Sequence, residues 1–386
     1  MVIKSSKSEL VLCETCRQSM YGLKEHSKVF QRTGAIRPMR TIDDSSIVIG
    51  DPMGKGSFNL VKAIVNKLPR IRSSMKMSSS SLQLNSLGNG YEENDDLSGR
   101  KYAFKSLRSD LSKSMVFNGA LDLTREAMFL NAISHPNIII LHSTAENPGR
   151  DYFLVIEKLD TTLTNALDMW KIQEDSCLKK LKLQRSKREL KKQALIKNRA
   201  EVLFGLVSAL SYLHGKNILY RDLKPDNIGM NTCTTTTNGD DGGDFEVTNV
   251  KLFDFGLATE LKEVDKVGQN EYNATKCTGS PRYMSHENYY GLPYGKPTDV
   301  YSFAFIFYQV VSLDTSFYLH KTLQIHEERV YKKNVRPKVN KCIPETLRKW
   351  IKSSWNHDAS ARPRMDSIFE GMSLYFKAAA TANGRS

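Results

Sequence analysis

The sequence has little of what secreted, membrane-spanning or zinc-scaffold proteins need. Its six cysteines follow no regular spacing, so we expect reduced thiols and no disulfide framework. Cys13 and Cys16 form a lone CxxC pair with only His26 nearby, which leaves a four-ligand zinc site without enough ligands. The most apolar stretch, Phe303 to Val311, is too short to span a bilayer and is typical of a buried helix.

The N-terminal region also lacks a recognisable targeting signal. No sustained apolar segment follows the first lysines, so a signal peptide is not expected. Val2 stands where N-myristoylation requires glycine. With reduced thiols, these absences lead us to expect a cytoplasmic or nuclear protein without membrane insertion.

Acidic residues are too few to balance the basic ones, and the net charge is +14. Most of the excess lies in two segments, with +5 in residues 1–40 and +7 in residues 168–199. Charge runs of this kind are usually solvated helix faces, and no recognition motif accompanies them. Nucleic acid is therefore not expected as a partner, whereas an acidic protein would fit the basic stretch 168–199.

The order of apolar runs predicts a small mixed unit followed by a helical one. Before residue 160, five β-branched or apolar runs predict strands, and Leu121 to Ile133 has helical spacing that ends at His135-Pro136. Residues 66–99 are rich in Ser, Asn and Asp and predict a flexible insertion. After Leu163 the pattern becomes mostly helical. The expected strands lie at residues 46–49, 61–65, 101–107, 138–142 and 152–157.

These patterns divide the chain into four parts. We expect a flexible N-terminal extension at residues 1–42, a first lobe at 43–160, a second lobe at 161–378 and a tail at 379–386. The second lobe would contain a basic helical insertion at 168–199 and a loop rich in Thr, Gly and Asp at 231–246.

Two short motifs carry the chemistry. Tyr220-Arg-Asp-Leu-Lys-Pro-Asp-Asn227 is followed further along by Asp254-Phe-Gly256. In this spacing Asp222 can accept the proton of an incoming hydroxyl, while Asn227 and Asp254 can hold magnesium at nucleotide phosphates. Asp-Phe-Gly alone is a common tripeptide, so the prediction depends on both motifs occurring together and in this order.

Further motifs extend the pattern on both sides. Gly54-x-Gly56 lies between two expected strands, Tyr102-Ala-Phe-Lys105 lies in a third, and Glu126 lies in the expected helix. With these residues the chain resembles the eukaryotic protein kinase family from Ser46 to Phe376, and it is most similar to the tyrosine-kinase-like group of serine/threonine kinases. The resemblance implies an α+β bilobal fold, with a small five-stranded N-lobe that has one main helix and a larger, mostly helical C-lobe.

The resemblance also assigns roles to residues. Asp222, Lys224, Lys105 and Glu126 would be catalytic, with Glu126 orienting Lys105 on the α- and β-phosphates. ATP and Mg²⁺ are the implied cofactors, and Asn227 and Asp254 the implied metal ligands. Ile156 would guard the back of the adenine pocket. The implied nucleotide-binding residues are Met53, Gly54, Gly56, Val61, Ala103, Lys105, Glu157, Leu159, Asn227 and Asp254.

Several other positions follow from the same resemblance. Glu287 would pair with Arg362, and Asp299 would fix the backbone of the catalytic loop. Arg221 would pair with a phosphorylated activation loop, for which Thr275 and Thr278 are equal candidates.

The chain departs from the family pattern at a few sites. Asn59 replaces a glycine, Gly229 replaces an aliphatic residue under the adenine ring, and Ser285-His286 replaces Ala-Pro. We expect a protein kinase that transfers the γ-phosphate of ATP to Ser/Thr hydroxyls of protein substrates in intracellular signalling. The alternatives are a pseudokinase scaffold that acts by protein binding, favoured by these departures, and a nucleic-acid binder that uses residues 168–199.

Overall fold

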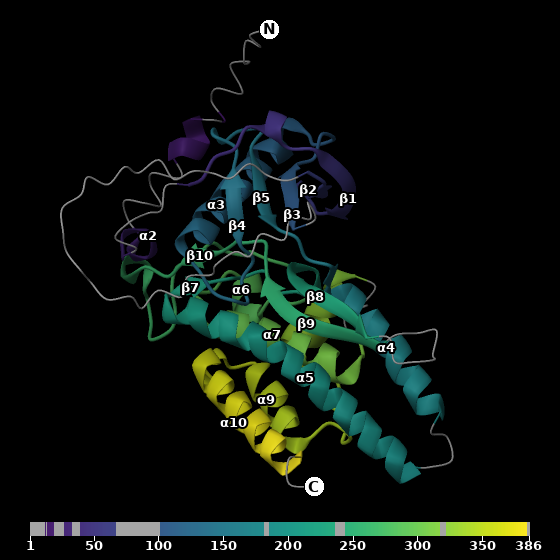
Figure 1. The fold of residues 1–386 in the computed structure, drawn as a ribbon. Coiled ribbons are helices and arrows are strands. Elements are labelled where there is room, and N and C mark those ends of the chain that lie inside the picture. Colours follow the sequence, from purple (N-terminus) through teal and green to yellow (C-terminus); the bar gives the residue numbers. More distant parts are fainter. Residues whose placement is uncertain are drawn as a thin grey trace, which may run out of the picture. The chain divides into compact units, whose positions relative to one another are not determined.

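The computed structural model divides the chain into two compact units (Figure 1). The first contains residues 1–17, 38–123 and 141–158, and the second contains residues 18–37, 124–140 and 159–386. Of the insertion expected at 66–99, only Asn66 lies within the described residues. The structure describes residues 12, 14–18, 27–32, 39–66, 101–180, 185–235, 244–316 and 322–383.

The described part of the first unit contains a five-stranded sheet in the order β1-β2-β3-β5-β4, with every neighbouring pair antiparallel. This confirms the five strands expected from the sequence. Side chains of Ile64, Phe104 and Val155 are buried together on one face, because alternate residues of a strand point to the same side. The strands are β1 (Ile49–Lys55), β2 (Asn59–Ile64), β3 (Tyr102–Leu107), β4 (Leu141–Thr144) and β5 (Phe153–Glu157).

The first and fourth strands differ most from their expected bounds. The first strand begins at Ile49 and continues through Gly54 to Lys55, so Gly54 lies in a strand and not in the turn. The strand expected at 138–142 begins only at Leu141. Ile138 instead forms an isolated parallel bridge to Leu252 in the second unit, and this backbone pairing takes it out of the sheet.

The main helix of this region, α3 (Lys113–Ala132), begins before the expected Leu121. Gly119 lies in its interior, where glycine weakens the helical signal of the sequence. A Cβ at Gly119 would lie 2.9 Å from the Cβ of Phe58, so a close approach to the sheet requires glycine here. Cys16 is fully buried in the same apolar cluster, together with Val116 and Ala120. Cys16, the cysteine of the CxxC pair that lies within the described residues, is therefore a core residue.

The second unit is mostly helical, with two small sheets in its described part. β6 (Thr161–Thr162), β8 (Ile228–Thr235) and β9 (Asp244–Leu252) form one sheet, and β7 (Ile218–Leu219) pairs with β10 (Thr259–Glu260). The main helices are α4 (Leu163–Lys180), α5 (Arg185–Gly215), α7 (Pro297–Ser312), α9 (Glu345–Ser354) and α10 (Met365–Asn383). Shorter helices are α2 (Lys28–Arg32), α6 (His286–Tyr289) and α8 (Leu323–His326).

Helix α7 is the centre of this unit. All residues from Thr298 to Val311 are buried, which confirms the buried helix expected at Phe303 to Val311. Its aromatic side chains supply much of the apolar area that stabilises the unit. Within the described ranges, no helix combines the length and the apolar character needed to cross a bilayer.

The loop expected at 231–246 is shorter than the sequence indicates. Residues 231–235 continue β8 and residues 244–246 begin β9, while residues 236–243 lie outside the described part. Threonine is β-branched and favours strands, so the Thr-rich composition supports pairing at Thr232, Thr234 and Thr235. Because the stretch is also of low complexity, the sequence predicts a loop there despite this β propensity.

The described parts of the basic stretch, residues 168–180 and 185–199, belong to two helices. They include the end of α4 and the beginning of α5, two long helices that are prominent in Figure 1. Arg199 is buried, and its Nη1 lies 2.8 Å from Oε2 of Glu174 in α4. Its Nε donates to the carbonyl of Val310, at 2.9 Å, near the C-terminus of α7. This arginine therefore joins three helices and is not part of an exposed basic surface.

We expect Arg199→Leu to lower the free energy of unfolding by about 3 kcal/mol, because Glu174 loses the cation beside it. Urea denaturation measures this change. Lys197→Ala, two residues earlier on the same helix and partly exposed, should change it by less than about 0.5 kcal/mol. Equal effects of the two substitutions would contradict the anchoring role.

Candidate active site

The carboxylate of Asp222 is held by three side chains in the second unit. Lys224 Nζ lies 2.8 Å from Oδ2, and Asn227 Nδ2 donates to the same oxygen at 2.8 Å. Ser280 Oγ donates to Oδ1 at 2.6 Å and accepts from Lys224 Nζ at 3.0 Å. Asp222 and Asn227 are buried, and Lys224 is partly exposed. The structure thus brings together Asp222, Lys224 and Asn227 as the sequence predicts, and it adds Ser280.

Sequence reasoning missed Ser280. No motif in the sequence assigns this residue a role. It lies 58 positions after Asp222, so only the fold shows that the two side chains bond.

The backbone before Asp222 is fixed by Asp299, as the sequence predicts. Asp299 lies in the first turn of α7 and is almost fully buried. Its Oδ2 accepts from the N–H of Tyr220 at 2.9 Å, and its Oδ1 accepts from the N–H of Arg221 at 2.8 Å. The Nε2–H of His214, at the end of α5, donates to Oδ2 at 3.0 Å.

These bonds hold a strained conformation. Arg221 has φ of +70°, a left-handed region that costs about 1–3 kcal/mol for a non-glycine residue. Gly279 has φ of +115°, and a Cβ there would lie 2.3 Å from the carbonyl oxygen of Arg221. Glycine at 279 therefore lets the following Ser280 approach Asp222.

The proposed metal ligands Asn227 and Asp254 lie on neighbouring backbone segments. The N–H of Phe253 donates to the carbonyl of Asn227 at 3.2 Å, and the hydroxyl of Tyr220 donates to the carbonyl of Phe253. Asp254 then has φ of +65°, again in the left-handed region. Burial raises the pKa of Tyr220 well above its ordinary value, and the nearby charges of Asp254 and Asp222 raise it further. Both carboxylates therefore lie close to this hydroxyl.

Oxygen donors of this kind suit magnesium. Asn227 uses its amide N–H groups on Asp222, at 2.9 Å to the carbonyl and 2.8 Å to Oδ2, so its side-chain oxygen is directed elsewhere. Carboxylate and amide oxygens are the hard ligands that Mg²⁺ prefers. Within the described ranges, no cluster of three or more His, Cys, Asp or Glu side chains could hold a metal ion. The residues present fit a Mg²⁺ ion shared with a nucleotide better than a metal held by protein alone.

The remaining residues predicted to bind nucleotide lie mainly in the first unit. Lys105 is buried in β3, directly opposite Leu154 of β5, next to the buried Ala103. Glu126 is buried in α3, in the part of that helix that belongs to the second unit. The roles of these residues and of Met53, Val61 and Glu157 stay predictions. Met53 is exposed, and Val61 and Glu157 are partly exposed.

The glycine-rich segment at the end of β1 has open space on its surface. A Cβ added at Gly54 would meet no other atom within 4 Å, so packing does not require glycine there. Both Gly54 and Gly56 are exposed, which leaves room for a ligand to approach the backbone. Asn59, which replaces a glycine of the family pattern, lies outside the left-handed region; it is the first residue of β2, paired with Leu107.

Comparison with known proteins identifies the family. A family model described as the protein kinase domain matches residues 85–372. The chain belongs to the protein kinase family. Its five-stranded sheet and its helical second unit agree with the α+β kinase fold expected from the sequence.

Curated relatives are similar to this kinase domain at low identity. Serine/threonine-protein kinase PknD of Chlamydia abortus is 27% identical over 253 residues, which are 62% of this chain and 24% of the relative. Serine/threonine-protein kinase 33 of Mus musculus is 26% identical over 287 residues, 73% of this chain and 52% of the relative. Dual specificity protein kinase shkE of Dictyostelium discoideum is 22% identical over 248 residues, which are 64% of this chain and 30% of the relative. The chain thus spans about half or less of these relatives.

In the kinase domain, a neighbouring side chain fills the space that glycine leaves at position 229. A Cβ at Gly229 would lie 2.1 Å from Cδ1 of Leu159 and 3.2 Å from Cε1 of Phe253. The side chain of Leu159 therefore occupies the space that a larger residue at 229 would take.

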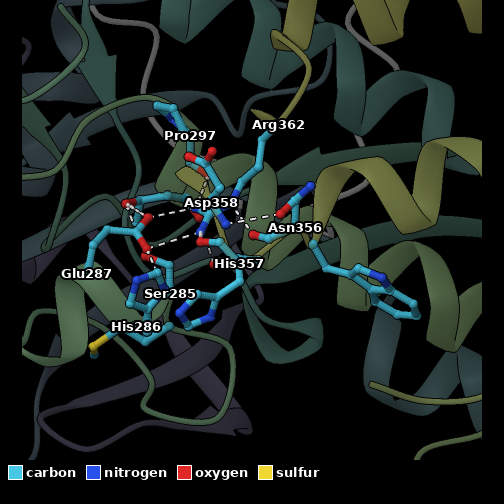
Figure 2. A network of polar contacts seen from close by, with 12 residues as sticks. Ser285, His286, Glu287, Pro297, Asn356, His357, Asp358 and Arg362 are labelled. Carbon is cyan, nitrogen blue, oxygen red and sulfur yellow. Dashed lines mark hydrogen bonds and ion pairs between the residues drawn. The ribbon is translucent and has the colours of Figure 1, made fainter. Parts of the chain in front are cut away.

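The predicted pair of Glu287 and Arg362 is present and buried (Figure 2). Arg362 Nη1 and Nη2 donate to the two carboxylate oxygens at 2.6 and 3.1 Å. Its other N–H groups donate to the carbonyls of Pro297, Asn356 and His357. Burial opposes the charged form of Glu287, but the charge and hydrogen bonds of Arg362 outweigh burial and keep its pKa below the ordinary value.

Two histidines stack beside this pair. The rings of His286 and His357 are 3.9 Å apart at their centroids and nearly parallel, at 11° (Figure 2). Nδ1 of His286 lies 3.1 Å from Oε2 of Glu287, although no hydrogen bond forms. Burial lowers the pKa of both imidazoles; Arg336 and Arg362 lower each further, while Glu287 raises both. His286 therefore packs where the family pattern has proline, and it does so as a neutral ring.

This stack predicts a pH dependence of stability. An unfolded histidine titrates near ~6.5, and both folded pKa values are lower, so the unfolded chain binds more protons in the window below ~6.5. The free energy of unfolding should stay level above that window and fall as pH falls through it. Urea denaturation between about pH 5 and 7.5 should show a weaker fall for His286→Gln/His357→Gln. An unchanged slope in the double variant would show that the stack does not titrate.

Proposed function

We propose that this kinase domain transfers the γ-phosphate of ATP to serine and threonine hydroxyls of protein substrates, in intracellular signalling. The observation that supports this most is the Asp222 carboxylate, oriented by Lys224, Asn227 and Ser280. The names of the Chlamydia and mouse relatives, both serine/threonine kinases, agree with the proposal.

The hydrogen bonds indicate which oxygen of Asp222 acts. A carboxylate has about four acceptor positions, two on each oxygen. Lys224 and Asn227 take those of Oδ2, whereas Ser280 takes one of Oδ1. Oδ1 can therefore accept the proton of a substrate hydroxyl. The hydroxyl oxygen then bonds to the γ-phosphorus, the bond from that phosphorus to the β–γ bridging oxygen breaks, and ADP leaves.

Lys224 is placed to contact the phosphoryl group during its transfer. It bonds Asp222 and Ser280 and remains partly exposed, so its ammonium can contact a phosphate that arrives beside Asp222. Asn227 and Asp254 would hold Mg²⁺, which would neutralise charge on the β- and γ-phosphates. Lys105 would position the α- and β-phosphates, with Glu126 as its partner.

A scaffold without activity has little support from the described residues. Two of the three departures that favoured it are compensated, because Leu159 fills the space at Gly229 and the Glu287–Arg362 pair forms beside His286. The third, Asn59, takes an ordinary strand conformation.

Finer features of the proposal depend on sequence alone. We assign the domain to the tyrosine-kinase-like group from the segment Asp299 to Phe303 and from Trp355 to Arg362. The exposed basic residues at the start of α5, such as Arg185, Lys187 and Arg188, would bind an acidic protein partner. A cytoplasmic or nuclear location is part of the same proposal.

The structure favours Thr275 over Thr278 as the regulatory phosphorylation site. Thr275 is exposed, and its carbonyl accepts from the hydroxyl of Tyr294 at 2.5 Å. The same hydroxyl accepts from Nη1 of Arg221 at 3.3 Å, so the side chain of Tyr294 connects Thr275 with Arg221. The hydroxyl of Thr278 instead bonds carbonyls of its own turn, and its backbone N–H is held by Asn288.

Asp222→Ala should lower kcat by about 10²–10⁴-fold while nucleotide binding is retained, because a general base contributes about that much. Transfer of labelled phosphate from ATP to a generic protein substrate measures turnover, and thermal stabilisation by ATP with Mg²⁺ measures binding. Ser280→Ala should lower kcat less, and Ser280→Thr should restore it because the hydroxyl is kept. Wild type with no more transfer than Asp222→Ala would remove the enzymatic proposal.

Thr275→Ala should reduce activity about tenfold, because a phosphate at this position would gain charge-assisted bonds with Arg221. Mass mapping of active protein should find phosphate on Thr275. In an Arg221→Gln background, the further change Thr275→Ala should have no additional effect. Active protein that is unmodified at Thr275 would contradict this site.

A further inference from the structure

Residues 27–32 form a packed element that lies outside the matched kinase domain. Ser27 is fully buried, Val29 is 8% exposed and Phe30 is 5% exposed. The hydroxyl of Ser27 accepts from the N–H of Phe30 at 3.0 Å and so caps the short helix α2. A helix of this length is not stable alone in water, so its burial reflects what it packs against.

The helix contacts α3, which carries Glu126, and β10, which follows Asp254 in the chain. The ring of Phe30 lies 5.5 Å from the ring of Phe129, which is fully buried in α3. The N–H of Val29 donates to Oε1 of Glu260 in β10, at 3.1 Å. All of these residues belong to the second unit. The same short segment thus touches both α3 and the strand that follows Asp254.

Spacing along each element shows what these contacts would control. Phe129 lies three residues after Glu126 and four after Arg125, so all three lie close together along α3. Arg125 Nη1 donates to the carbonyl of Gly256, directly after Asp254 and Phe255, at 2.8 Å. Arg125 therefore joins α3 directly to the segment that contains Asp254. Helix α2 makes a second connection, from α3 to β10, which follows that segment.

The contact with β10 reaches the catalytic loop as well. Glu260 pairs with Ile218 of β7, and Thr259 pairs with Leu219, which directly precedes Tyr220. Oε2 of Glu260 is buried and has no hydrogen-bond partner among the residues that the structure describes. The bond from Val29 thus partly satisfies a carboxylate that would otherwise be costly to bury.

We propose that residues 27–32 act as a positioning element for phosphoryl transfer, which rests on the proposed function. Phe30 holds α3 through Phe129, and Val29 holds β10 through Glu260, so that Glu126 and Asp254 keep one relative arrangement. The element acts through these residues and does not contact substrate.

The full chain with Phe30→Ala tests the proposal by amide hydrogen exchange and by turnover. Exchange should become about tenfold faster in residues 124–132 and 256–260, and kcat at saturating ATP should fall about tenfold, which corresponds to about 1.4 kcal/mol. Phe30→Leu should restore most of both, because it keeps apolar volume against Phe129. Glu260→Ala should behave like Phe30→Ala, and Glu260→Gln like wild type, because the amide oxygen can still accept.

Phe369→Ala is the matched control. Phe369 is a partly buried aromatic residue of α10 whose ring stacks on Phe204 at 4.9 Å, in the same unit but on other helices. The Phe369→Ala substitution should lower the melting temperature without changing amide exchange in residues 124–132 or 256–260. If Phe30→Ala gave the same uniform loss as this control, or left kcat unchanged, the positioning role would be wrong. Localised exchange in a protein without any transfer activity would instead contradict the proposed function alone.

Discussion

The carboxylate of Asp299 is the interaction on which the catalytic loop depends. Two backbone N–H groups and the His214 imidazole donate to it in a buried site, where such bonds are stronger than in water and an unpaired group is costly. Arg221 can keep its left-handed backbone only because these bonds outweigh the strain. The strained turn in turn directs Asp222 toward its partners, so one residue at the start of α7 determines where the proposed base lies.

Further constraints act on the loop from Gly279-Ser280 and from Phe253-Asp254. Gly279 approaches the carbonyl of Arg221 so closely that no larger residue fits, and Ser280 then bonds Asp222. On the other side, the hydroxyl of Tyr220 is tied to Phe253, directly before Asp254. Each contact fixes a different segment relative to the same carboxylate. Their combined effect is preorganisation, because the donors are in place before any substrate binds.

The sequence could predict most of what lies within one motif. Asp222, Lys224 and Asn227 fall in six consecutive positions, so their convergence follows from a local turn, and the five strands follow from runs of β-branched residues. Contacts that depend on packing between distant segments could not be predicted. Ser280 on Asp222 and Leu159 over Gly229 depend on side-chain directions, which spacing along the chain does not determine.

Motif departures are therefore a weak guide to lost activity in this domain. A substitution removes function only when no neighbour takes over the physical role of the missing side chain. Leu159 supplies the volume that Gly229 lacks, and the neutral ring of His286 stacks on His357 while leaving the bond of Arg362 to Glu287 intact. In each case the compensating residue comes from another segment of the same unit. A motif compares one position at a time, whereas packing satisfies volume and charge over all positions in contact.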